Sequence, residues 1–232
     1  MAAFGKSRVL GIFLWASFLA AGPCISGCAG LAGSGAATHP VDLTGIELLL
    51  VAPFDAFSPH RMASMNRCPV CNAVVSGGAV EPGAADYMTR QLMAHLKATS
   101  DYDLLGPGMA TGVRARIIST DVGVSRRRLL VQMGREIGAD AVVSGVVYRF
   151  EQRVGTALSV ESAASAGFGV HLLRCSDGRL LWSDHFDETQ HNLSENLFEL
   201  PSFVKRGGQW LTVEKLAAYG LSEIMKGFPA PK

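Results

Sequence analysis

Two cysteines separated by two residues are the most distinctive chemical feature of this sequence. They are Cys68 and Cys71, with a proline and a valine between them. Three chemistries use this spacing: a small disulfide, a redox dithiol and half of a tetrahedral zinc site. We favour a disulfide that pins a long loop, or two inert thiols. Zinc needs two further ligands, for which Cys175 and His60 are candidates, but no second pair with this spacing exists. We therefore expect no bound metal or other cofactor, and we keep metal binding and thiol-redox chemistry as alternatives.

The surroundings of the cysteine pair weaken the redox alternative. A redox dithiol normally stands at the amino terminus of a helix in a thioredoxin-like β-α-β unit, and the flanking sequence does not have that pattern. Haem attachment is excluded because Asn72 stands where a histidine is required.

Other candidate groups are polar residues without a recognisable catalytic pattern. Arg126–Arg128 form a run suited to an anionic polymer, although a solvated helix start is the more frequent role of such a run. Asp184, His185 and His191 suggest acid–base chemistry. However, Asp184 and His185 are neighbours in a predicted strand and point to opposite faces, so we expect surface residues. No nucleophile elbow of the Gly-x-Ser-x-Gly type is present. We predict a protein without catalytic residues.

The amino terminus has the pattern of an export signal. Lys6 and Arg8 precede an apolar stretch from Val9 to Ala21, which is too short for a stable membrane span but fits a signal peptide. Ile25-Ser26-Gly27-Cys28 then resembles the bacterial lipobox. The resemblance implies that residues 1–27 are removed, and that Cys28 receives a diacylglyceryl group and palmitate-like acyl chains.

The composition of the rest fits one globular domain. Residues 28–40 are rich in Gly, Ala and Ser and predict a flexible tether, so residues 41–232 remain for a single domain. The formal charge of +1 falls to about −1 without the signal, which argues against a nucleic-acid partner. Ala29 follows the lipidated position, and by resemblance to sorting rules of enteric bacteria this implies the outer membrane, with the domain facing the periplasm.

Hydrophobic periodicity predicts alternating elements in the first half of the domain. The apolar run Ile46–Phe54 indicates a buried strand, and a stripe beginning at Ala84 indicates a helix to about Lys97. A short strand is expected at Tyr102–Leu105. A second helix is expected at Arg126–Ile137, capped by Ser125 and ended by Gly138. Residues 55–83 lack periodicity and predict a long loop, and Gly106-Pro107-Gly108 predicts a turn.

The second half predicts a meander followed by a helix. Strands are expected at Ala141–Arg153, Phe168–Cys175 and Arg179–Glu188, with a tight turn at Asp177-Gly178. A helix capped by Thr212 is expected at Val213–Lys226. The order β-α-β-α-β-β-β-α predicts an α/β fold with a mixed sheet and helices packed on it.

Three of these segments carry a resemblance to a known family. Leu49–Phe54, the Gly-Ala-Asp entry into a strand within Ile137–Gly145, and the hairpin at Asp177–Trp182 resemble the amino-terminal domain of TolB and CsgG. The resemblance implies a periplasm-facing domain that binds proteins or envelope polymers. We therefore expect a non-catalytic lipoprotein that acts as a binding, assembly or secretion accessory. The alternatives are a metal-binding or thiol-redox protein that uses Cys68 and Cys71, and a subunit of an oligomeric export channel.

Overall fold

Strand β6 (Ala141–Glu151) is the centre of the sheet, because its first eight residues are all buried. The structure is a computed structural model that describes residues 42–57, 65–155, 160–190 and 211–231. These described residues belong to one compact unit. The short branched residues of β6 suit a strand covered on both faces. Among the described residues, no helix combines the length and apolarity needed to cross a bilayer.

Five strands form the main path of a mixed sheet, confirming the predicted fold class. Their order is β10 (Leu180–Thr189), β9 (Ser165–Arg174), β6, β1 (Leu48–Val51) and β5 (Asp103–Leu105). The pairs of β1 with β5 and with β6 are parallel, whereas β6–β9 and β9–β10 are antiparallel. The short strand β2 (Asp55–Ala56) adds a parallel pair to the far end of β6.

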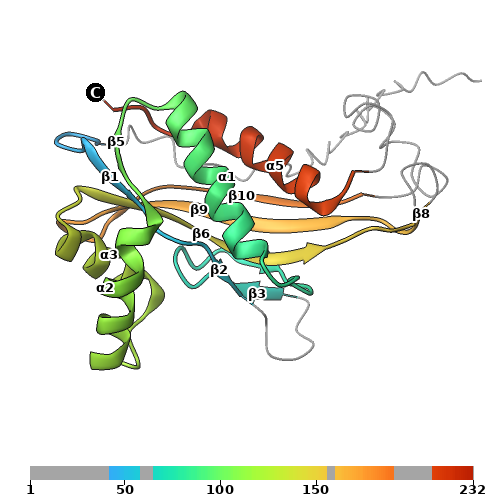
Figure 1. The fold of residues 1–232 in the computed structure, drawn as a ribbon, viewed down its shortest axis with the longest axis horizontal. Coiled ribbons are helices and arrows are strands. Elements are labelled where there is room, and N and C mark those ends of the chain that lie inside the picture. Colours follow the sequence, from blue (N-terminus) through green and yellow to red (C-terminus); the bar gives the residue numbers. More distant parts are fainter. Residues whose placement is uncertain (1–41, 58–64, 156–159, 191–210, 232) are drawn as a thin grey trace, which may run out of the picture. The chain divides into compact units, whose positions relative to one another are not determined.

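Helices α1 (Ala84–Thr99) and α5 (Val213–Ile224) cover one face of this sheet, and a short 3-10 turn, η2 (Met225–Gly227), follows α5. They lie side by side in Figure 1. The core between these helices and the sheet is apolar and continuous. Its fully buried members include Met88, Leu92, Leu96, Val143, Phe168, Leu172 and Leu216.

The opposite face is covered in two parts. Helices α2 (Pro107–Thr120) and α3 (Arg126–Ile137) pack over one end, where Leu130 and Met133 of α3 are buried. A two-stranded hairpin of β3 (Met65–Arg67) and β4 (Val74–Ser76) joins the same apolar cluster. A second small hairpin, β7 (Val154–Gly155) with β8 (Val160–Ser162), follows β6. The cysteine-bearing hairpin is therefore a layer on the sheet.

The predicted helix ends are confirmed where capping residues mark them. The Ser125 hydroxyl accepts from the Arg128 amide at the start of α3, and Gly138 ends the helix at φ 82°. This left-handed conformation is inexpensive only for glycine. Thr212 caps α5 in the same way by accepting from the Lys215 amide. The helix predicted to end near Lys97 continues to Thr99.

Two predictions about the connections are wrong. Residues 55–83 are not one irregular loop, because they hold β2, β3 and β4, which are too short to show periodicity. Gly106-Pro107-Gly108 is not a turn: Gly106 is the N-cap of α2 and Pro107 is its first residue, a position that tolerates proline. Helix α2 was not predicted from the sequence, because only Ala110 and Ile117 of this helix are buried and the helix therefore lacks an apolar stripe.

Asp55 ties α2 and α3 to the sheet. Its carboxylate forms ion pairs with Arg126 and with Arg114, the latter at 2.9 Å. The Arg126 side chain is only 10% exposed, and burial lowers its pKa to about 10. Within the arginine run only Arg126 is engaged in a buried ion pair, whereas Arg127 and Arg128 are exposed. Arg127 donates to the Gly178 carbonyl, and Arg128 lies 3.8 Å from Asp121.

Candidate metal centre

Cys68 and Cys71 lie in the turn of the β3–β4 hairpin. The Cys68 amide donates to the Ala73 carbonyl at 2.8 Å, and the Cys68 carbonyl accepts from the Asn72 amide at 2.9 Å. Asn72 has a φ of 65°, a conformation that asparagine tolerates better than most residues. The Val70 amide points at the Cys68 sulfur, 3.4 Å away. The turn therefore gathers both thiols and supplies a backbone donor to one of them.

His171 and His185 reach the same place from the sheet. In the β9–β10 register His171 pairs with Ser183 and His185 pairs with Gly169, so the histidines are diagonal neighbours on one face. His171 is completely buried. Gly169 leaves room for the second ring: a β-carbon on it would lie 2.6 Å from His185 Cδ2.

The four ligand atoms converge within 4.8 Å of one another. His171 Nε2 lies 3.3 Å from the sulfurs of Cys68 and Cys71, and His185 Nε2 lies 3.4 Å from Cys71 Sγ. In a tetrahedral zinc site, Zn–S of about 2.3 Å and Zn–N of about 2.0–2.1 Å place sulfur and nitrogen about 3.5 Å apart. The observed spacings are those of two thiolates and two imidazoles arranged around one ion.

The surroundings favour a thiolate at Cys68. A hydrogen bond from Cys71, with further ones from His171 and His185, holds the Cys68 pKa far below its ordinary value against the effect of burial. The pKa of Cys71 is raised, because it keeps the shared proton and is itself buried. A divalent cation would replace that proton and favour the thiolate in both side chains.

The remaining sequence candidates lie elsewhere. Cys175 is buried against Gly134 of α3, outside the cluster, and burial raises its pKa to about 11. All three described cysteines are free thiols, and the disulfide between Cys68 and Cys71 stays a prediction. Cys28, His60 and His191 lie outside the described residues.

The two histidine ligands were not identified from the sequence. His185 was expected on the surface, yet it is half-buried on the face covered by the hairpin. A usable signal was present at His171, a polar residue within the otherwise apolar run from Val170 to Leu173 of β9, which is buried on both faces. Simple alternation along β10 would put Leu180 on one face with Trp182 and Phe186, but a register shift between Leu180 and Trp182 puts it on the other.

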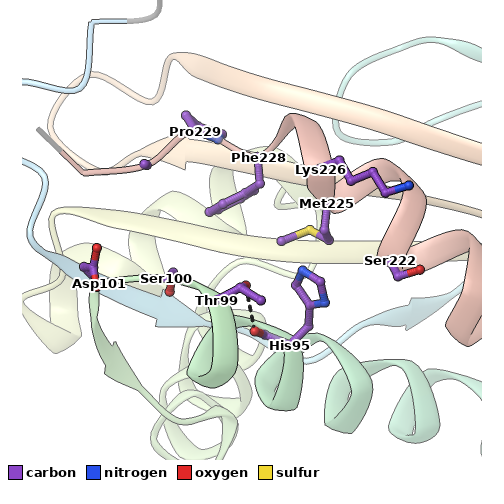
Figure 2. Close-up of a pocket in the computed structure, with 10 residues that line it drawn as sticks. His95, Thr99, Ser100, Asp101, Ser222, Met225, Lys226, Phe228 and Pro229 are labelled. Carbon is purple, nitrogen blue, oxygen red and sulfur yellow. Dashed lines mark hydrogen bonds between the residues drawn. The ribbon is translucent and has the colours of Figure 1, made fainter.

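A cavity of about 310 Å³ lies on the opposite side of the sheet, between the carboxyl ends of α1 and α5 (Figure 2). Its charged and polar lining residues have other roles. Burial lowers the pKa of His95, which favours the neutral ring, and the Lys226 ammonium binds Glu223 at 2.7 Å. Thr99 donates to the His95 carbonyl. The lining therefore does not assemble the convergent polar groups seen at the cysteine–histidine cluster.

Comparisons with known proteins give similarity at the level of structure. No family model and no curated protein matches the sequence. The LpoB C-terminal domain from Salmonella enterica is 14% identical, with a TM-score of 0.39, over 65% of this chain and 90% of that one. The PelC dodecamer from Paraburkholderia phytofirmans is 12% identical, with a TM-score of 0.44, over 78% and 86%. Lipoprotein GNA1162 from Neisseria meningitidis is 15% identical, with a TM-score of 0.40, over 69% and 96%. The chain is thus similar to these three structures without being assigned to a family.

Proposed function

We propose that this protein is a lipid-anchored protein of the bacterial cell envelope whose α/β domain binds one zinc ion through Cys68, Cys71, His171 and His185. The observation that carries the zinc site is the convergence of these four ligand atoms within 4.8 Å. The lipobox at Cys28 supports the anchor. Anchored in this way, the domain acts without catalysis as a binding, assembly or secretion accessory.

The chemistry of the four ligand side chains indicates which metal ion would bind. Two thiolates and two imidazoles in tetrahedral array are the ligands of structural zinc, whereas Mg²⁺ and Ca²⁺ prefer oxygen. Four protein ligands fill a tetrahedral shell, so the site leaves no position for a substrate or a reactive water. A closed shell fits a structural role rather than a catalytic one.

Zinc would join segments that are distant in sequence. Cys68 and His171 are 103 residues apart, and Cys71 and His185 are 114 apart. The β3–β4 hairpin contributes few buried apolar side chains of its own, among them Val70 and Val75. A metal bond between the hairpin and the sheet would supply stability that this small apolar contact lacks, because metal binding couples directly to folding. The hairpin then becomes a fixed surface for an envelope partner.

Zinc binding can be tested with a substitution that adds one methyl group beside a ligand. Gly169→Ala places a β-carbon 2.6 Å from His185 Cδ2 and displaces a ligand, so we expect the zinc content to fall from about one ion per chain to a small fraction of that. Gly167→Ala is the matched control: it is buried in the same strand, and its new carbon would lie 3.5 Å from Arg149 Cβ. The measurement is metal analysis of mature protein purified from membranes in detergent. Wild type without zinc, or equal content in both variants, contradicts the proposal.

The anchor has its own test. Cys28→Ala removes the acceptor thiol, so we expect no incorporation of a fatty-acid analogue and no normal maturation of the precursor. Each buried CH₂ of an acyl chain contributes about 0.8 kcal/mol to membrane binding, so several chains dominate retention. Acyl labelling that persists in the variant shows that the anchor lies elsewhere, and Cys175→Ala serves as the control for loss of a cysteine.

A further inference from the structure

Tyr148 carries a buried hydroxyl group that lacks a partner within the described part of the chain. The residue is only 2% exposed, and its oxygen has no hydrogen bond there. Leaving a buried hydroxyl unsatisfied costs free energy, so such a group calls for an explanation. Tyr148 belongs to β6, the strand that bears the sheet's central pairs.

Tyr148 lies on the face of β6 that carries the metal centre, together with Val142 and Val146, and a β-bulge stands at this position. The β6–β9 register skips Tyr148, since Val147 pairs with Phe168 and Arg149 with Gly167. Bulges re-orient side chains and are frequent beside functional sites. The Tyr148 carbonyl accepts from the Gly78 amide, just after β4, so the same residue also holds the end of the cysteine hairpin.

The hydroxyl lies beside the proposed ligand His185. An idealised β-carbon on Gly169 would be 2.9 Å from Tyr148 Oη and 2.9 Å from His185 Nε2, so both atoms border the same small space. The Tyr148 ring is nearly parallel to that of His185, at 17°. Tyr148 and Cys68 are buried in the same cluster, and a tyrosine hydroxyl is a hydrogen-bond donor at neutral pH.

We propose that, in the zinc-loaded protein, Tyr148 donates its hydroxyl proton to the Cys68 thiolate as a positioning residue. The inference rests on the proposed zinc site. Zinc occupies the Nε2 lone pair of His185, which leaves the sulfur as the acceptor. Together with the Val70 amide, the tyrosine gives Cys68 two donors. Such outer contacts fix ligand orientation, and their loss typically weakens metal affinity about 10–100-fold.

The test uses Co²⁺ as a spectroscopic probe in the purified full-length mature protein. Tyr148→Phe keeps the ring and removes the donor, so the sulfur becomes more electron-rich. We expect the thiolate-to-cobalt charge-transfer band to move to lower energy. We also expect zinc affinity, measured by competition with a chromophoric chelator, to fall about tenfold or more.

Tyr102→Phe is the matched control. Its hydroxyl donates to the Pro229 carbonyl, and its ring belongs to the core on the other face of the sheet. The control should leave both the band and the affinity unchanged. Wild type that takes up no metal defeats the proposed zinc site itself. Wild type that binds metal, with Tyr148→Phe giving the same band and the same affinity, defeats the inference alone.

A measurement on wild type covers the case in which Tyr148→Phe does not fold. With ¹¹³Cd in the site, the Tyr148 hydroxyl proton should exchange slowly and show scalar coupling to the metal through sulfur. A rapidly exchanging hydroxyl without coupling in metal-loaded protein overturns the inference.

Discussion

Replacing His171 with alanine will release the zinc and lower the melting temperature by on the order of 10 °C. The expected size follows from two magnitudes: metal binding contributes directly to folding free energy, and 1 kcal/mol corresponds to about 2–4 °C in a domain of this size. His171 contacts both sulfurs and is completely buried. Its loss removes the bond between hairpin and sheet. The measurement is a melting curve of the mature protein with and without a chelator.

Two comparisons separate zinc from a disulfide in this experiment. Chelated wild type should melt near the His171→Ala variant, whereas that variant should be insensitive to chelator. His95→Ala, a histidine on α1 outside the cluster, should retain both zinc and stability. A Cys68–Cys71 disulfide would close only a tiny ring and add little stability. If chelator and Cys68→Ser with Cys71→Ser both leave the melting temperature unchanged, the metal account is wrong.

Val143→Asp will yield no soluble folded protein. Val143 is fully buried in β6, between Val51 of β1 and Leu172 of β9. An unpaired carboxylate at this position costs several kcal/mol, against a total stability of about 5–15 kcal/mol. Expression and far-ultraviolet circular dichroism provide the measurement.

Val154→Asp is the matched control for that substitution, because Val154 in β7 is 53% exposed. It should be soluble, with a melting temperature close to that of wild type. A soluble Val143→Asp variant with an unchanged melting temperature would show that the core lies elsewhere.

The sequence was most informative where local chemistry decides local structure. The ends of α3 follow from Ser125 and Gly138, and the fully covered strand β6 follows from its run of small and branched residues. The mixed sheet could be predicted because the five strands of its main path and most of its helices carry a clear apolar pattern. Helix α2 was missed because it buries too little to show one.

Only the cysteine half of the metal centre could be predicted from the sequence. Cys68 and Cys71 can be recognised from their spacing in the sequence. Their histidine partners lie more than a hundred residues away and are brought next to them by the β9–β10 register. His171 belongs to one strand and His185 to the next. Their relation is a property of sheet pairing, and the alternation of each strand on its own predicts only which face a residue occupies.

X-ray absorption at the zinc edge, measured on the protein as isolated from membranes, identifies the atoms that bind the metal. The account predicts about one zinc ion per chain, bound by two sulfurs at about 2.3 Å and two imidazole nitrogens at about 2.0–2.1 Å. Protein isolated without zinc, or with zinc in a shell of oxygen and nitrogen that lacks sulfur, would contradict a centre built from Cys68, Cys71, His171 and His185.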